Sequence, residues 1–150
     1  MTKQKERMTI GALECCDLPD LGISHLQVRV DTGATTSSLH VDNIEEFEKN
    51  GKRWVRFDIH PDIHNVKKIV TTTAPLQAKK VVKSSSADKE KRVVIKTTFK
   101  IGQDSWPIKL TLTDRSSMTY LMLLGREAMK DRILVDPSYD FLISNENESV

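Results

Sequence analysis

Apolar and polar residues alternate along much of this chain, and this period of two constrains its fold more than any other feature. In residues 26–31 the apolar side chains fall on one face of an extended segment, while Gln27, Arg29 and Asp31 share the other face. The same alternation recurs in three later segments, residues 55–59, 93–98 and 108–112. Short segments patterned in this way are typical of strands in a barrel or a sandwich, so the sequence predicts an all-β fold.

Turn-forming residues separate these segments, and helix formers are rare. Gly, Pro, Asn, Asp and Ser gather at residues 50–51, 60–62, 74–75, 84–88 and 102–104. The best helix candidate is residues 126–130, which follow Gly125, and a weaker candidate covers residues 43–49. We therefore expect many strands joined by turns, with one short helix near the C-terminal end.

The length of 150 residues fits one domain, and a domain of this size buries about two thirds of the surface that its unfolded chain exposes. We expect a folded domain over residues 9–144, flanked by disordered segments at residues 1–8 and 145–150. The longest apolar run, residues 120–124, is too short to cross a bilayer, so no membrane association is expected.

The first residues and the cysteines indicate a reducing compartment. The N-terminal residues lack the apolar core of a signal peptide. Cys15 and Cys16 are adjacent, and such a pair predicts no disulfide framework. Together these observations predict a cytoplasmic protein.

Charge is distributed unevenly along the chain. The net charge is +2, but residues 66–100 hold ten Lys and Arg residues and only two acidic ones. Acidic residues concentrate at 42–48 and in the C-terminal tail. The basic segment contains one aromatic residue, Phe99, whereas nucleic-acid sites interleave aromatic and basic side chains. The pattern favours an acidic peptide over nucleic acid as a partner, although lysines that only protect strand edges would produce it too.

Residues 28–39 hold the group that hydrolytic chemistry would need. A strand delivers Asp31 into a tight loop. The hydroxyl of Thr32 can form a hydrogen bond to the backbone across this loop. Gly33 permits a close backbone approach and a positive φ, and its amide can donate to the Asp31 carboxylate. Two such carboxylates sharing one proton can activate a water and supply a proton to an amide. An Asp at a strand end can also simply cap a turn.

A second segment lies about ninety residues downstream. In residues 121–126 an apolar run ends at Gly125 and then turns into the expected short helix. A strand ending in Asp-Thr-Gly-Ala, followed by an apolar-Gly-Arg junction of this kind, resembles the retropepsin-like fold, in which the second segment packs behind the catalytic loop. The resemblance implies a closed acid-protease barrel with one short C-terminal helix.

The chain from about residue 10 to residue 141 also resembles a bacterial family labelled ATP-dependent zinc proteases and described as RimK-associated retropepsin-like proteins. The resemblance is carried by residues 10–11, 18–23, 31–39, 55–57, 82–86, 92, 112–115, 118 and 123–126. It implies an aspartic endopeptidase in which Asp31, with Thr32 and Gly33, is catalytic. Because such a chain holds one catalytic Asp, it implies a symmetric homodimer in which two copies of Asp31 meet on a two-fold axis.

Some members of this family are associated with RimK-like ATP-grasp ligases, which add glutamates to protein tails. The resemblance therefore implies an acidic, glutamate-rich peptide or protein substrate, with such a ligase as a second partner. The resemblance also implies a flap near residues 79–92 that covers the catalytic loop. The substrate-binding residues would be Ala34, residues at this flap, and Arg115 as a secondary candidate; the residues at the flap are Lys79, Lys80, Lys83, Ser84, Ser85 and Arg92.

Two further readings of the sequence stay open. Arg126 is expected to bridge to backbone or to an acidic residue within the fold, in preference to contacting substrate. The whole domain could also be a catalytically inactive retropepsin-like module that binds peptides or only dimerises, because a fold does not determine an activity.

The histidines and cysteines predict no metal site, and we expect no cofactor. His25, His40, His60 and His64 lie in no metalloprotease motif. His60 and His64 have the i, i+4 spacing of two ligands on a helix, but Pro61 follows His60 and no Glu accompanies them as a general base. The sequence contains no Ser-His-Asp arrangement of known order and no glycine-rich phosphate loop.

Overall fold

The computed structural model describes residues 6–61, 68–83, 89–114 and 120–143. Its elements are β1 (Met8–Ile10), β2 (Leu13–Leu18), the 3-10 turn η1 (Pro19–Leu21), β3 (Ile23–Val30), β4 (Ser37–Lys49), β5 (Lys52–Ile59), β6 (Val70–Lys83), β7 (Lys89–Ile101), β8 (Asp104–Asp114), β9 (Met122–Leu124), α1 (Arg126–Met129) and β10 (Ile133–Val135). Of the segments expected to be disordered, residues 1–5 and 145–150 lie outside the described residues, as does the turn at 84–88, whereas Met8 begins β1.

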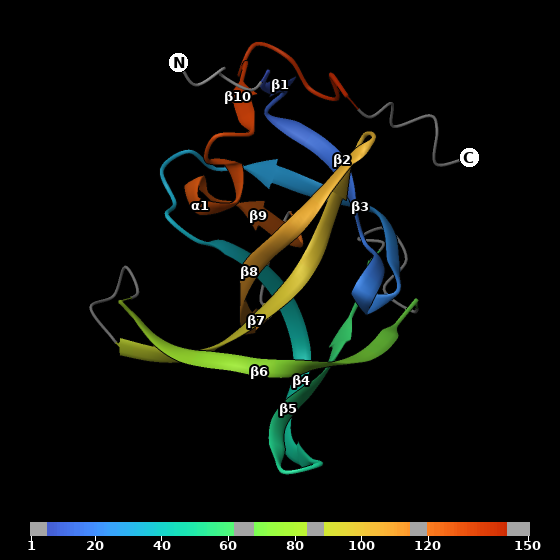
Figure 1. Ribbon diagram of the computed structural model, residues 1–150, viewed down its shortest axis with the longest axis vertical. Helices are drawn as coiled ribbons and strands as arrows, with labels where there is room; N and C mark the ends of the chain where they lie inside the picture. The colour runs from blue at the N-terminus through green and yellow to red at the C-terminus, as the bar shows by residue number, and fades with distance from the viewer. Residues whose placement is uncertain (1–5, 62–67, 84–88, 115–119, 144–150) are drawn as a thin grey trace, which may run out of the picture.

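Most strands form one sheet that curls back on itself (Figure 1). Its order is β2-β3-β9-β4-β5-β6-β7-β8, and additional pairings of β2 with β7 and of β4 with β8 close it into a barrel. A separate parallel pair, β1 with β10, lies at the top of the view and joins segments from the two ends of the chain. The prediction of an all-β barrel with one short C-terminal helix is confirmed.

The segments of alternating polarity lie within β3, β5, β7 and β8 or directly follow them, and their apolar faces build the core. The fully buried side chains of these strands include Leu26, Val28, Val55, Phe57, Ile59, Ile95, Phe99 and Leu110. In the described ranges, no helix has the length and apolar content needed to span a membrane.

The prediction of a helix at residues 43–49 is wrong, because these residues form the outer half of β4. They pair with β5 in a hairpin that protrudes at the bottom of Figure 1. Its two-residue turn, Asn50 and Gly51, has φ angles of 52° and 75°, which suit a tight hairpin. Phe47 and Trp54 are partners across it, with ring centroids 6.5 Å apart. Such cross-strand pairs outweigh the helix propensity of a short acidic segment.

The turn predicted at residues 74–75 is also wrong, because β6 continues through it. Pro75 is the last residue of β6 that pairs with β5, opposite Trp54, and from Leu76 onward β6 pairs with β7. A proline, which lacks an amide hydrogen, fits at a point where a strand changes its partner. Pro75 therefore marks the point where one long strand changes the strand with which it pairs, and not a turn between two strands.

A buried carboxylate attaches the C-terminal segment to the barrel. Glu14, in β2, is fully buried, and its Oε2 accepts hydrogen bonds from the amides of Gly11 at 2.8 Å and Leu142 at 2.9 Å. The amide of Ile143 donates to the same carboxylate at 3.2 Å. The burial of Glu14 is therefore explained by amide donors from both ends of the chain.

Candidate active site

Asp31 stands at the end of β3, where the loop of residues 31–36 begins. Its amide donates to the carbonyl oxygen of Leu124 at 2.9 Å, next to the last pair of β3 with β9, Val30 and Leu124. Its Oδ1 accepts a hydrogen bond from the amide of Gly33 at 3.0 Å. The residue is half-buried, so its carboxylate is oriented while part of the side chain remains exposed.

Gly33 has the expected role beside the carboxylate but not the expected backbone angle. A Cβ at this position would lie 3.2 Å from Asp31 Oδ1, so glycine provides the space in which the amide approaches the acid. The expectation of a positive φ is wrong, since the positive-φ glycines of the described chain are Gly22, Gly51 and Gly102. Close approach, and not a left-handed conformation, is the reason for glycine here.

The downstream segment packs against the Asp31 loop, as the sequence resemblance implies. The amide of Gly125 donates to Ser37 Oγ at 3.0 Å. A Cβ on Gly125 would lie 2.6 Å from both the carbonyl carbon and the carbonyl oxygen of Thr36. Only glycine therefore allows the end of β9 to approach the loop this closely.

The first turn of α1 holds the same loop. The amide of Arg126 donates to the carbonyl oxygen of Ala34 at 2.9 Å, and that of Glu127 to the carbonyl oxygen of Thr35 at 3.0 Å. The Arg126 guanidinium donates to the Thr32 carbonyl oxygen and to Thr35 Oγ1, each at 3.0 Å. The structural role expected for Arg126, a bridge to backbone, is confirmed.

Arg29 belongs to this region but was not among the site residues predicted from the sequence. It lies two residues before Asp31 in β3, its partner in β9 is Leu123, and Leu123 in turn pairs with Ser38 of β4. Its guanidinium lies over the ring of Tyr120, 5.6 Å from the ring centroid. The alternation of residues 26–31 already places Arg29 and Asp31 on one face of the strand, so this pattern could have identified Arg29 as a neighbour of the site.

The basic residues of the β6–β7 hairpin differ in how they are engaged. Lys79 Nζ lies 2.9 Å from Glu46 Oε1 in β4, and this hydrogen bond holds the pKa of Glu46 below its ordinary value. Lys80 is exposed and lies opposite Arg92 across the two strands. Of the predicted substrate residues in this hairpin, Lys80 and Arg92 are thus brought together, while Lys79 is bound within the fold.

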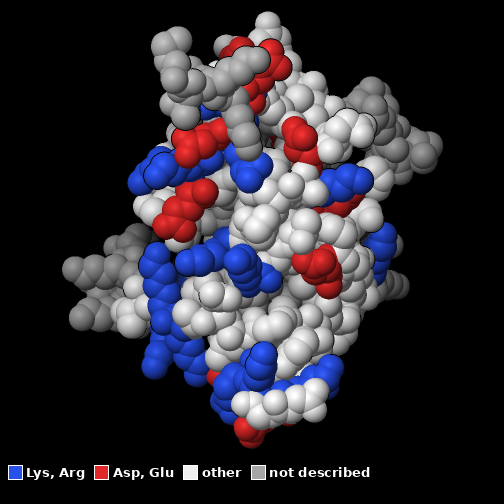
Figure 2. Space-filling view, viewed as in Figure 1, with Lys and Arg blue, Asp and Glu red and all other residues white. Residues whose placement is uncertain are grey.

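The remaining predicted substrate residues lie at the edge of the described residues or outside them. The strand register places Lys83 opposite Lys89. Ser84, Ser85 and Arg115 lie outside the described residues. In Figure 1 the end of the β6–β7 hairpin and the loop 31–36 both lie toward the left of the view, and Figure 2 shows Lys and Arg side chains gathered at the lower left of that face.

His40, in β4, is a buried histidine. Its Nδ1 lies 2.6 Å from Thr113 Oγ1 in β8, and no residue of the described ranges provides a hydrogen-bond partner for its Nε2. Burial lowers the pKa of His40 below its ordinary value; the backbone of Asp114 opposes this shift and the charge of Arg92 adds to it. The imidazole is therefore held toward its neutral form.

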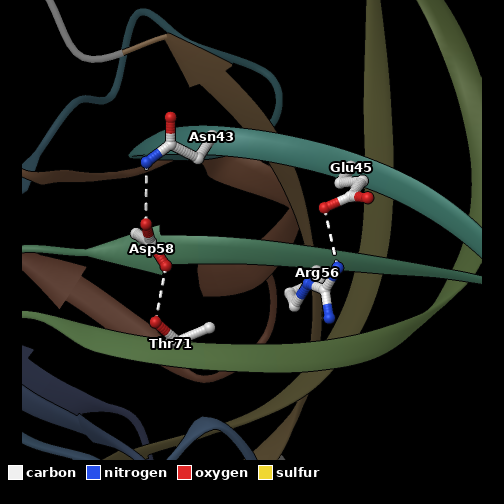
Figure 3. Close-up of polar contacts among 5 residues, drawn as sticks. All are labelled: Asn43, Glu45, Arg56, Asp58 and Thr71. Atoms are coloured by element: carbon white, nitrogen blue, oxygen red, sulfur yellow. Dashed lines mark hydrogen bonds and ion pairs between the residues drawn. The ribbon is translucent and has the colours of Figure 1, made fainter.

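A separate polar network ties β4, β5 and β6 together (Figure 3). Asp58 accepts hydrogen bonds from Thr71 Oγ1 at 2.6 Å and Asn43 Nδ2 at 2.8 Å, and these bonds hold its pKa below the ordinary value. Arg56 pairs with Glu45 at 2.7 Å. This network secures the pairing of the hairpin strands and is built on strands other than β3 and β9, which position Asp31.

The described residues do not provide a ligand set that fits the zinc of the resembled family label. Among them, no three His, Cys, Asp or Glu side chains are grouped so that they could hold a metal ion. His60 Nε2 lies 2.7 Å from Asp42 Oδ2, and Cys16 Sγ lies 3.8 Å from the sulfur of Met122. His64 lies outside the described residues.

Curated relatives of this chain carry the name "Probable alpha-L-glutamate ligase". The relative from Desulfotalea psychrophila (strain LSv54 / DSM 12343) is 42% identical over 138 residues, which are 92% of this chain and 30% of that protein. The relative from Parasynechococcus marenigrum (strain WH8102) is 44% identical over 131 residues, 87% of this chain and 28% of that protein. The chain thus spans less than a third of the length of these relatives.

A solved structure and a family description agree with the retropepsin-like resemblance. A protein of unknown function (DUF785) from Legionella pneumophila subsp. pneumophila str. Philadelphia 1 matches with a TM-score of 0.77 and 32% identity, over 92% of this chain and 99% of that chain. The family described as "RimB-like: Retropepsin-like aspartic endopeptidase RimB" matches residues 9–146. These findings support the retropepsin-like part of the resemblance and not its ATP-dependent zinc protease label. The chain belongs to the RimB-like family of retropepsin-like aspartic endopeptidases.

Proposed function

We propose that this chain is an aspartic endopeptidase that acts as a homodimer and hydrolyses peptide bonds in acidic, glutamate-rich protein tails. The observation that carries the proposal is the bracing of the Asp31 loop. The Gly33 amide orients the carboxylate, and β9 and α1 hold the loop around it through Gly125 and Arg126. An acid that only capped a turn would need the Gly33 bond alone, so the additional support favours a role in catalysis.

The proposed mechanism needs a second carboxylate. The Asp-Thr-Gly triplet occurs once in the chain, so the second carboxylate would be the Asp31 of another copy, related by a two-fold axis. Two carboxylates in contact cannot both ionise, so the pair holds one proton and titrates as a unit. The ionised copy takes a proton from the attacking water, and the protonated copy supplies a proton to the amide of the substrate.

Two observations support a glutamate-rich substrate. Lys80 and Arg92 lie opposite each other on the β6–β7 hairpin, and such charge attracts acidic chains. Relatives that contain a region similar to this chain are named probable alpha-L-glutamate ligases. We therefore propose that an ATP-grasp glutamate ligase makes the tails that this chain cleaves, and that both act in the cytoplasm.

Incubation of the purified protein with a peptide that ends in a run of glutamates, followed by mass spectrometry, tests the proposed activity. The wild-type protein should release shorter tails, and Asp31→Asn should abolish cleavage because it removes the shared proton while preserving shape. Asp131→Asn is a matched control, because Asp131 is exposed and its φ of 66° is one that Asn tolerates. Cleavage that survives in Asp31→Asn would contradict the proposed chemistry.

The alternative of an inactive binding module predicts a different result. Such a module would bind the glutamate peptide equally well with or without Asp31→Asn, and neither protein would release product. Sedimentation measured alongside activity tests the dimer, because activity per chain should rise with the dimer fraction. A fully active monomer would contradict the mechanism of two shared carboxylates.

A further inference from the structure

Arg29 places a positive charge beside Asp31 on the same strand. Asp31 directly follows β3, and its amide continues the hydrogen bonding of β3 to β9 by donating to the Leu124 carbonyl oxygen. Residues two apart in an extended segment lie on one face with about 7 Å between their Cα atoms, so we expect Arg29 and Asp31 to project from the same side. Arg29 is exposed, whereas Val28, on the opposite face, is fully buried in the core. The side of β3 that carries Asp31 therefore also presents a guanidinium to solvent.

This guanidinium is positioned without being neutralised. Arg7, Arg53 and Arg56 each pair with a carboxylate. Arg29 has no ion pair or hydrogen bond with any residue in the described part of the chain, and it rests over the Tyr120 ring, 5.6 Å from the centroid. Stacking on a ring restricts the side chain while leaving its N–H donors available in the plane of the guanidinium.

The neighbours of Arg29 suit a short acidic side chain. Leu123 of β9 is the partner of Arg29 across the sheet, and Ser38 of β4 is the partner of Leu123. Leu123 is half-buried and apolar. The surface beside Asp31 thus combines an aliphatic contact with a planar cation, which matches the methylene groups and the carboxylate of a glutamate.

We propose that Arg29 is a specificity residue, which binds a substrate carboxylate on a residue adjoining the bond that Asp31 cleaves. The inference rests on the proposed peptidase function, and it narrows the substrate from an acidic chain in general to one with a carboxylate at the cleavage point. A planar guanidinium can bind a carboxylate through two parallel hydrogen bonds, a geometry that a lysine ammonium does not offer. A glutamate side chain and a C-terminal carboxylate present the same group.

Binding to the Asp31→Asn protein, which should not turn over, tests the inference apart from catalysis. Adding Arg29→Gln should weaken the binding of a labelled glutamate peptide about 10- to 100-fold. A matched glutamine peptide should bind equally with and without Arg29→Gln. Arg7→Gln removes an exposed arginine that pairs with Asp131, and it should leave affinity unchanged.

The binding and cleavage results separate the two proposals. Unchanged glutamate-peptide affinity in Arg29→Gln would overturn the inference, even if the wild-type protein cleaves the peptide. A wild-type protein that binds through Arg29 but releases no product would overturn the proposed peptidase function and leave the carboxylate contact standing.

Values of kcat/KM for modified peptides identify which carboxylate is bound. If the bound carboxylate is a glutamate side chain, replacing the glutamates that flank the cut by glutamine should reduce kcat/KM in the wild type and not in Arg29→Gln. If the bound carboxylate is the C-terminus of the peptide, amidating that C-terminus should reduce kcat/KM in the wild type and not in Arg29→Gln. Arg29→Glu should prefer lysine-flanked peptides, a reversal that a purely structural residue would not produce. A uniform loss on all peptides would overturn the inference.

Discussion

The amide of Gly125 donates a hydrogen bond of 3.0 Å to the side-chain oxygen of Ser37, although the two residues are 88 positions apart in the chain. The contact joins the end of β9 to the start of β4, and the Asp31 loop lies between β3 and β4. A loop fixed in this way is ordered by the fold itself, so the proposed substrate binding and catalysis would not bear the entropy of ordering it. The junction is therefore a preorganising element of the candidate site.

Gly125→Ala should destabilise the protein and reduce kcat. The added Cβ would lie 2.6 Å from backbone atoms of Thr36, and relieving this overlap would displace the Asp31 loop. We expect the free energy of unfolding to fall by about 1–3 kcal/mol, measured by urea unfolding. Gly51→Ala is a control of comparable cost, about 1–2 kcal/mol, because its φ is 75°, but it lies in the distant hairpin turn and should leave kcat unchanged. Equal effects of the two changes on kcat would contradict this role of the junction.

Glu14→Gln should lower the free energy of unfolding by about 2–4 kcal/mol. The buried carboxylate accepts amide hydrogens from Gly11, Leu142 and Ile143, and a neutral amide with one acceptor oxygen cannot serve all three. Urea unfolding measures the loss. Glu127→Gln, an exposed change in α1, should stay within about 0.5 kcal/mol of the wild type. If Glu14→Gln were equally mild, the carboxylate would not be what holds the C-terminal segment.

The stability of the protein should decrease below about pH 6.5, in part because of His40. Burial lowers the pKa of His40 in the folded state, whereas an unfolded histidine titrates near its ordinary value. As the pH falls through that value, the unfolded chain binds a proton that the folded chain does not, so the free energy of unfolding declines until the pH is below the folded-state pKa.

His40→Gln should therefore flatten the dependence of unfolding free energy on pH between about pH 5 and about pH 8. Urea unfolding across this range measures the slope. His25→Asn is the control, because His25 is exposed and has a φ of 55° that Asn tolerates. A slope that responds to neither change would exclude His40 as its source.

The KM for a glutamate peptide should rise with salt, and Lys80→Gln should weaken this dependence. Lys80 is exposed, and its cross-strand partner Arg92 carries the same charge and so does not neutralise it. The ammonium group of Lys80 is therefore available to an acidic chain. Lys79→Gln should have a smaller effect, because Lys79 is already bound to Glu46 at 2.9 Å. The range from about 0.01 to about 1 M salt shortens the Debye length from about 30 to about 3 Å and so spans the effect. Equal changes in KM for the two variants would argue against this distinction.

Local patterns in the sequence were sufficient to predict the strand that carries Asp31 and the tight turn of the β4–β5 hairpin. The alternation over residues 26–31 places Asp31 at a strand end, on the same face as Arg29, and the Asn50-Gly51 pair makes the predicted tight turn. These features depend on residues close together in the chain. The same reasoning failed at residues 43–49 and at Pro75, where pairing with β5 or β7 outweighs local propensity.

By itself the sequence determined that this chain forms a β barrel and that one Asp-Thr-Gly loop follows a strand. Only the tertiary structure decided which charges are buried, paired or open. Glu14 receives the amide of Leu142 from 128 positions away, Lys79 is bound to Glu46, and Arg29 is left with a ring and no acid among the described residues. Such partners meet through pairing between distant strands, and a local period of two carries no information about which strands will be neighbours.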